Sequence, residues 1–123
     1  MIRTVDLVIV GMTTAGSAAT VDAAGRGTRV LVVTESRDGS SVRALRRSLK
    51  AAGEGWQERL SVLTGVEVVW IDGTSAVEVV LLRQITTGRL LGINTSAVFL
   101  TTAVPAGSIA PAIREQVLKG TAG

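Results

Sequence analysis

The sequence predicts a single α/β domain of three layers, in which a parallel sheet forms the core and an antiparallel β-meander lies beside it. Short apolar runs rich in Val, Ile and Leu alternate with helical patterns early in the chain, which is typical of parallel strands joined by helices. Later runs are separated only by short turns, which predicts antiparallel strands. A length of 123 residues suits one domain over residues 1–123, and 46% hydrophobic residues suffice for a core.

A β-α-β unit opens the chain. Residues 5–10 form a nearly continuous apolar run, the pattern of a strand buried on both faces of a parallel sheet. Residues 14–24 are mostly small and favour a helix that lies close to the sheet, with a glycine-rich end at residues 25–27. Residues 29–34 repeat the apolar run, so we expect a second parallel strand and a right-handed crossover between the two.

A long amphipathic helix is expected next. Between residues 43 and 63 the apolar side chains recur every three or four positions, which places them on one helical face. Gly53 and Gly55 within this pattern indicate a kink. Residues 66–72, rich in Val, are expected to form the third strand of the parallel core.

The rest of the chain predicts a hairpin, a further strand and a short helix. Residues 76–94 contain two apolar runs around a turn in which Gly88 supplies a positive φ. Residues 97–102 form another apolar run, which we expect, like the first two, at the centre of the sheet. The loop at 101–107 leaves the carboxyl edge of that sheet, where its hydroxyls either line a ligand site or simply end the strand. Residues 111–119 are expected to form a short helix.

The composition excludes several classes of chemistry. The chain has no Cys, no His and no Tyr, which excludes zinc sites of Cys and His, thiol redox chemistry and nucleophiles activated by His. No catalytic residue and no metal ligand set is predicted, so a bound cofactor would have to carry any chemistry. The sequence shows neither an apolar run long enough for a membrane helix nor a signal-peptide pattern, from which we expect a cytoplasmic protein that contacts no membrane.

The hexapeptide G-M-T-T-A-G follows the first strand and opens the first helix, which is the position of a dinucleotide-binding fingerprint. Gly11 takes the place of the glycine that makes the tight turn, and Gly16 that of the glycine that lets the helix approach the strand. Thr13 stands where the backbone must approach the pyrophosphate, so its side chain either blocks a dinucleotide or, like Thr14, offers a hydroxyl to a phosphate oxygen. Glu35 follows at the spacing expected for the acid that binds the ribose hydroxyls. In the alternative interpretation, the glycines only shape a turn and no cofactor binds.

Residues 5–33 resemble the opening β-α-β unit of the two-dinucleotide-binding-domain flavoproteins. V-D-L-V-I-V-G and the later A-G-S-A-A stand where that family has V-I-V-G-x-G-x-A-G-x-A-A. From there to residue 102, the order of elements resembles the pyridine-nucleotide domain of the thioredoxin reductase group. The resemblance implies a Rossmann-like fold that binds NAD(P) or FAD, with Arg37 and Arg43 placed to contact an adenosine 2′-phosphate. Glu35 would oppose that phosphate and favour a plain 2′-hydroxyl.

The chain departs from that family at positions that matter for function. Thr13 replaces the middle glycine, and Glu35 and Ser36 replace the first His and Arg of the basic H-R-R-x-x-x-R loop. No C-x-x-C motif is present, so a thioredoxin-reductase-like enzyme would lack the redox-active disulfide. In the family the flavin and the nicotinamide occupy separate domains, and this length suits only one, so we expect no complete reductase.

Two hypotheses for the function remain open. In the first, the chain is a stand-alone domain for NAD(P) or FAD that serves as an accessory subunit of a flavin- or nicotinamide-linked oxidoreductase, with the missing half on a partner chain. In the second, it is a non-catalytic protein with a degenerate fold that binds no cofactor and acts through oligomerisation or partner binding. A third interpretation, binding of a mononucleotide at the amino end of the first helix, needs only that helix terminus.

Two surfaces bear on association. The hairpin carries apolar side chains with few elements left to cover them, which predicts a homo-oligomer. These side chains belong to Val77, Val79, Leu81, Leu90 and Ile93. Residues 37–50 concentrate positive charge, and Arg46, Arg47 and Lys50 are interpreted as the solvated face of a helix. No nucleic-acid partner is expected, because the few aromatic residues lie on core-facing patterns.

Overall fold

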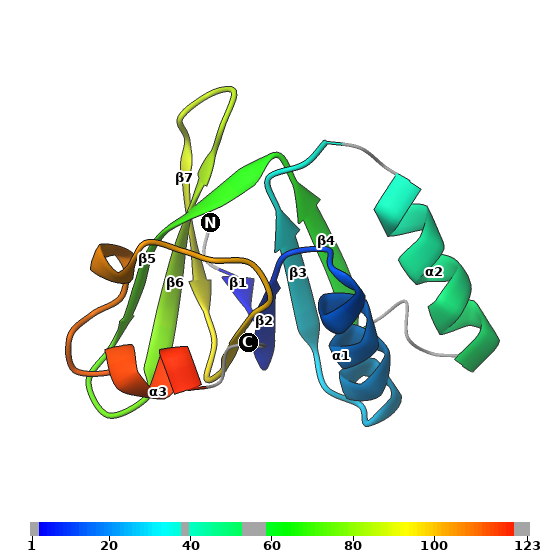
Figure 1. Ribbon diagram of the computed structural model, residues 1–123, viewed down its shortest axis with the longest axis horizontal. Coiled ribbons are helices and arrows are strands. Elements are labelled where there is room, and N and C mark those ends of the chain that lie inside the picture. The colour runs from blue at the N-terminus through cyan, green and yellow to red at the C-terminus, as the bar shows by residue number, and fades with distance from the viewer. Residues whose placement is uncertain (1–2, 38–39, 53–58, 120–123) are drawn as a thin grey trace.

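The computed structural model describes residues 3–37, 40–52 and 59–119, which form two four-stranded sheets and their helices (Figure 1). The parallel sheet has the order β4 (Leu60–Thr64), β3 (Val30–Thr34), β2 (Leu7–Val10) and β8 (Val98–Leu100). The second sheet has the order β1 (Arg3–Thr4), β7 (Leu90–Asn94), β6 (Val77–Gln84) and β5 (Val66–Gly73). Helices cover one face of the parallel sheet and the second sheet covers the other, so the predicted three-layer α/β fold is confirmed.

The central strands are apolar throughout because each face of the parallel sheet contacts its own core. Val8 of β2 and Leu31 of β3 face the second sheet and are fully buried. The alternate side chains, among them Ile9 and Val32, face the helices and are also fully buried. Successive side chains of a strand point to opposite faces, so a strand between two cores needs no polar positions.

The first helix, α1 (Thr14–Gly25), packs closely on the parallel sheet. Its buried residues are all small: Gly16, Thr20, Ala23 and Ala24. The helix ends where the glycine-rich stretch predicted, and Gly27 follows with a φ of +84°. The short side chains let the helix backbone approach the strands. They also bring the start of the helix close to the loop that precedes it.

The second helix, α2 (Ser40–Ala52), is anchored by longer side chains. Leu45 and Leu49 are 1% and 2% exposed and pack into the core between α2 and the sheet. The helix was expected to continue to residue 63, and it does not. Its expected kink at Gly53 and Gly55 lies outside the described residues.

The segment expected to end that helix forms strand β4 instead. Leu60 and Leu63 fit a helical spacing, but a short apolar segment also fits a strand, so the pattern alone was misleading. Pairing with β3 decides the outcome: the Val30 amide donates a hydrogen bond to the Arg59 carbonyl at 2.7 Å, and Val30 lies opposite Leu60. A tertiary contact therefore overrides a local periodicity.

Strand β5 belongs to the antiparallel sheet, whereas residues 66–72 were predicted in the parallel core. The chain passes from Thr64 to Val66 through Gly65, which has a φ of +66°. This conformation is accessible to glycine without strain, and it turns the chain from one sheet into the other. The Gly65 carbonyl also accepts a hydrogen bond from the Ile85 amide at 3.0 Å.

The β6–β7 hairpin is antiparallel as expected. Strand β5 pairs antiparallel with β6 and extends the hairpin to a meander, and β1 adds to β7 in parallel. The meander's inner side chains include Ile71 and Val80, both fully buried between the sheets. Ile93 is also fully buried there, so its assignment to an exposed apolar face is wrong. Gly88 has a φ of +74° in the turn between β6 and β7, as predicted.

Strand β8 lies at an edge of the parallel sheet, not at its centre as expected. Only Leu100 of its three residues is buried. After β8 the chain crosses to the second sheet, where the short helix η2 (Ala106–Ser108) contacts β5. The Ala110 amide then donates a hydrogen bond to the Ile71 carbonyl of β5 at 2.8 Å. The last helix, α3 (Arg114–Lys119), is shorter than the expected helix. None of the helices in the described part of the chain has the length and apolar character needed to span a membrane.

Candidate functional site

A cavity of about 500 Å³ opens between the two sheets, at the carboxyl ends of β2 and β3. Open α/β folds place ligands at this edge, and small-molecule sites occupy about 300–1,000 Å³. The lining comes from residues 10–12, 33–35, 66–69 and 102–105, with Arg83 and Ser108. Both sheets and the loop after β8 therefore contribute to one site.

Gly11 lines this cavity in a conformation that requires glycine. Its φ is +105°, and a Cβ placed on it would lie 2.6 Å from both the Thr101 hydroxyl oxygen and the Thr102 Cγ2. The Thr101 hydroxyl donates to the Val10 carbonyl at 2.8 Å, which ties the loop after β8 to the end of β2. Thr102 itself lines the cavity.

Gly16 provides the close approach of α1 to the loop. A Cβ on Gly16 would lie 2.5 Å from the Gly11 carbonyl oxygen, too near for any larger residue without a shift of the backbone. The Gly16 carbonyl accepts a hydrogen bond from the Thr20 hydroxyl at 2.7 Å. The first and third glycine positions of the fingerprint thus have the geometric roles expected of them, although Gly16 lies outside the cavity lining.

Thr13 caps the amino end of α1. Its side-chain oxygen accepts a hydrogen bond from the Gly16 amide at 3.1 Å, and its backbone is extended, as is usual at an N-cap. Thr14, the first residue of the helix, is exposed. Neither threonine lines the cavity. One of the amide donors that a helix amino end offers to an anion is therefore satisfied by the chain itself.

Glu35 follows the end of β3 and lines the same cavity as Gly11. Thr34, at the strand tip, also lines it, and its hydroxyl oxygen accepts from the Ser36 amide at 3.3 Å. Glu35 itself is exposed and lines the cavity at the carboxyl edge of the sheet. Two of the residues predicted from the fingerprint, one glycine and the acid, meet at one site.

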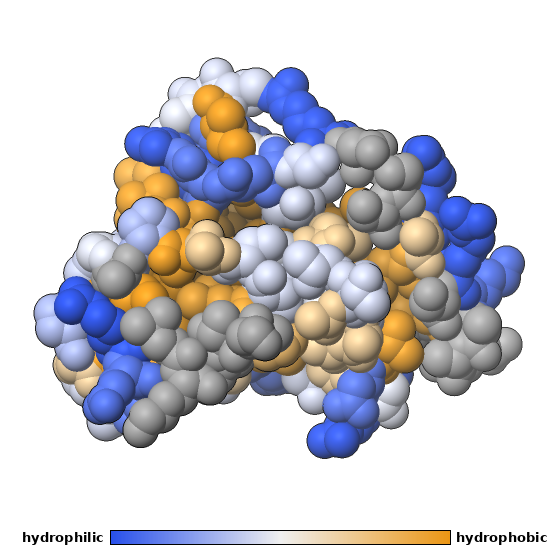
Figure 2. Space-filling view, viewed as in Figure 1, coloured by the Kyte–Doolittle hydropathy of each residue, from blue (hydrophilic) through white to orange (hydrophobic). Residues whose placement is uncertain are grey.

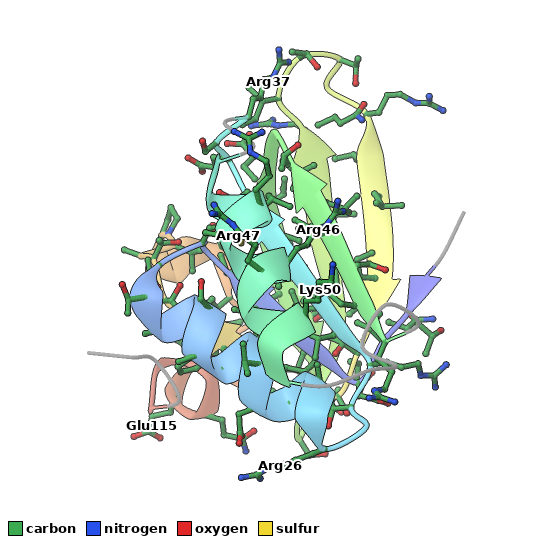
Figure 3. All side chains as sticks on the ribbon, turned by 90° about the vertical axis from the view of Figure 1, so that its right-hand side faces the viewer. Arg26, Arg37, Arg46, Arg47, Lys50 and Glu115 are labelled. Carbon is green, nitrogen blue, oxygen red and sulfur yellow. The ribbon has the colours of Figure 1, made fainter. Side chains whose placement is uncertain are left out.

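The two arginines expected at a 2′-phosphate lie outside the cavity lining. Arg37 is exposed, and its side chain lies along Gly65. A Cβ added to Gly65 would be 3.4 Å from both Cγ and Nε of Arg37. Arg43 is exposed on α2. Figure 3 shows Arg37 at the end of the molecule from which α2 begins.

The structure adds an ion pair to the cavity wall that the sequence analysis missed. Arg83 of β6 donates through Nε to a Glu67 carboxylate oxygen at 2.7 Å, and its terminal nitrogen contacts the same oxygen. Both residues line the cavity. They lie opposite each other in the β5–β6 register, so their pairing becomes visible only when that register is known.

Solved structures share this fold, although no protein-family model and no curated protein matches the chain in sequence. Thioredoxin reductase from Streptococcus pyogenes has a TM-score of 0.64 at 19% identity, over 83% of this chain and 32% of that one. A myxobacterial chondrochloren halogenase, described as a variant of FAD-dependent halogenases, has a TM-score of 0.61 at 12% identity, over 82% and 38%.

THI4 from Thermovibrio ammonificans has a TM-score of 0.62 at 16% identity, over 94% of this chain and 62% of that one. The chain has the fold of a Rossmann-type flavoprotein domain. The resemblance to that domain, drawn from the opening strand, loop and helix, is thereby confirmed for the fold. The chain spans 32% of the reductase and less than two thirds of the other two proteins.

Proposed function

We propose that this chain is the dinucleotide-binding accessory subunit of a cytoplasmic flavin- or nicotinamide-linked oxidoreductase, and that its cavity binds NAD(P) or FAD. The observation that carries the proposal is the meeting of Gly11 and Glu35 on one cavity at the carboxyl edge of the parallel sheet. In dinucleotide-binding folds, the first of these positions makes the tight turn that opens the phosphate-binding loop, and the second holds the ribose. The fold shared with an FAD-dependent halogenase supports the same conclusion.

The cavity suits the adenosine half of such a cofactor. Gly11 lines the cavity, and a Cβ at this position would meet the side chains of Thr101 and Thr102, so the turn requires glycine here. The Glu35 carboxylate would accept hydrogen bonds from ribose hydroxyls. Because that carboxylate opposes a phosphate, while Arg37 and Arg43 lie outside the lining, we expect NAD or FAD to be preferred over NADP.

When bound, the nicotinamide or flavin ring supplies the hydride or electron chemistry. The chain itself binds and orients the cofactor, because it has neither His nor Cys to exchange protons near neutral pH. The solved structures that share the fold are longer than this chain. In this proposal, a partner chain contributes the substrate side of the site.

A second candidate is a non-catalytic function, in which the fold persists without a cofactor and the protein acts by oligomerisation or partner binding. Thr13 favours this candidate. Its hydroxyl already satisfies the Gly16 amide at the amino end of α1, the terminus that binds a pyrophosphate in related folds. It also brings a side chain to the position where the fingerprint has its middle glycine.

Titration calorimetry with NADH, NADPH and FAD distinguishes the two candidates. We expect NADH or FAD to bind more tightly than NADPH, and Glu35→Gln to weaken that binding and reduce the discrimination against NADPH. Glu115→Gln is the matched control, because Glu115 is exposed on α3 and outside the cavity lining. Absence of binding by all three cofactors would favour the non-catalytic candidate. A visible flavin absorbance band in the purified protein would identify FAD directly.

A further inference from the structure

The exposed face of α2 carries a row of cations. The row consists of Arg43, Arg46, Arg47 and Lys50, all exposed. Their spacing of three and four residues places them on one helical face, over a length of about 10 Å at a rise of about 1.5 Å per residue. Figure 3 shows Arg46, Arg47 and Lys50 on the outer side of α2, and Figure 2 shows hydrophilic residues along this side of the molecule. We refer to the four residues as the basic row.

The charge of the chain is concentrated around this row. Five cations and one acid between residues 37 and 50 give that segment a net charge of +4, which leaves −1 for the rest of a chain whose total is +3. The ion pairs found among the described residues join Arg26 to Asp22, Arg29 to Asp6 and Arg83 to Glu67. None of these pairs involves the basic row, so no carboxylate in the described part of the chain neutralises it.

The fold holds the basic row outward. Leu45 and Leu49 on the opposite side of α2 are buried in the core, so the helix cannot turn its cations away from solvent. Like charges three and four residues apart on a helix repel one another and disfavour the helix. The row therefore works against the stability of α2 unless an anionic surface lies against it.

We propose that the basic row is a docking surface for an acidic face of a partner protein. A positive patch of this kind guides association with a complementary negative patch and orients the partner on contact. The inference goes beyond the proposed cofactor site and does not depend on it, because none of the four cations lines the cavity.

Three other occupants fit the observations less well. Insertion of α2 into a lipid surface needs its apolar face, which is already buried by Leu45 and Leu49. Four phosphate contacts give duplex DNA only weak binding, and the described aromatic side chains, Trp70 and Phe99, are part of the packed structure. A second copy of the chain has no matching row of acids on the helices described, since α1 carries only Asp22 and α3 only Glu115.

A pair of double variants tests the proposal in the full chain. Arg46→Gln with Arg47→Gln removes half of the basic row, whereas Arg26→Gln with Arg89→Gln removes the same charge from exposed positions elsewhere. The probe is a short helical peptide with glutamates at positions i, i+3, i+4 and i+7, and its binding is measured by fluorescence anisotropy in about 20 mM salt, where screening is weak. Duplex DNA and phosphatidylserine vesicles serve as the competing probes.

We expect the α2 variant to bind the acidic peptide roughly tenfold more weakly and the control variant to change by less than about twofold. Thermal melting of the α2 variant should be unchanged or slightly raised, because the variant relieves repulsion between like charges. Equal losses in the two variants would show that only total charge matters and would overturn the proposal. So would failure of the wild-type protein to bind the peptide, or tighter binding to DNA or vesicles that depends on the same two arginines.

Discussion

The two sheets of the molecule bury their strands differently. Strands β2 and β3 lie between two cores, so adjacent residues such as Val8 and Ile9 are both fully buried, on opposite faces. In the antiparallel sheet one face is packed and the other lies at the surface: Val80 is fully buried, whereas the neighbouring Leu81 is only partly buried. A substitution of the same type should therefore have very different effects in the two sheets.

The largest expected effect comes from an acid in the parallel sheet. Ile9→Asp places an unpaired carboxylate in a core with no access to water, and we expect a loss of more than about 4 kcal/mol from a typical stability of about 5–15 kcal/mol. Leu81→Asp, on the partly buried face of β6, should cost much less. Chemical denaturation of both variants measures the difference, and similar losses at the two positions would contradict the comparison.

A smaller effect on stability is expected when a glycine with close neighbours is replaced by alanine, and almost none when the glycine has no close neighbour. Gly16→Ala brings a Cβ to within 2.5 Å of the Gly11 carbonyl oxygen, so we expect a loss of about 1–3 kcal/mol. A Cβ on Gly92 of β7 meets no atom within 4 Å, and Gly92→Ala should be neutral or slightly stabilising. Thermal melting checks the pair. A tolerated Gly16→Ala would mean that α1 can move away from the loop.

Thr13 allows a test in which the fold is hardly disturbed. Thr13 is the N-cap residue of α1. Replacing it with Ala should therefore cost about 1 kcal/mol of stability, whereas replacing it with Gly should cost only a few tenths of a kcal/mol. If the Thr13 side chain hinders a dinucleotide, Thr13→Gly should bind NADH or FAD more tightly than the wild-type protein. Calorimetric titration of both forms gives the sign, and tighter binding by the wild type would instead assign the hydroxyl a role in holding phosphate.

The smallest effect on stability is expected at the tip of the hairpin. Ile85 and Leu90 are 49% and 61% exposed, so replacing both with Ser should change the free energy of unfolding by no more than about 0.5 kcal/mol. If this tip mediates the predicted oligomerisation, the double variant should dissociate at concentrations where the wild-type protein associates. Sedimentation over a range of concentrations measures the association state of both proteins. A wild-type protein that is monomeric at every concentration would contradict the prediction of a homo-oligomer.

The elements whose signals are local could be predicted from the sequence. The continuous apolar runs predicted β2 and β3, the small residues predicted α1, and Gly88 marked the hairpin turn with its positive φ. Each of these signals reflects the conformation or burial of neighbouring residues, so it can be seen in a short window. Gly11 and Glu35 line one cavity because they follow the two parallel strands of the β-α-β unit, and parallel strands end at a common edge of the sheet.

The sheet that each later strand joins depends on long-range contacts and could not be predicted from the sequence. Leu60 and Leu63 fit a helix or a strand equally well, and hydrogen bonding to β3 selects the strand. Gly65 then carries β5 into the second sheet, where Glu67 meets Arg83 at the cavity wall. These outcomes depend on contacts between residues far apart in the chain, whose free energy exceeds the small differences in local preference, and no local pattern contains them.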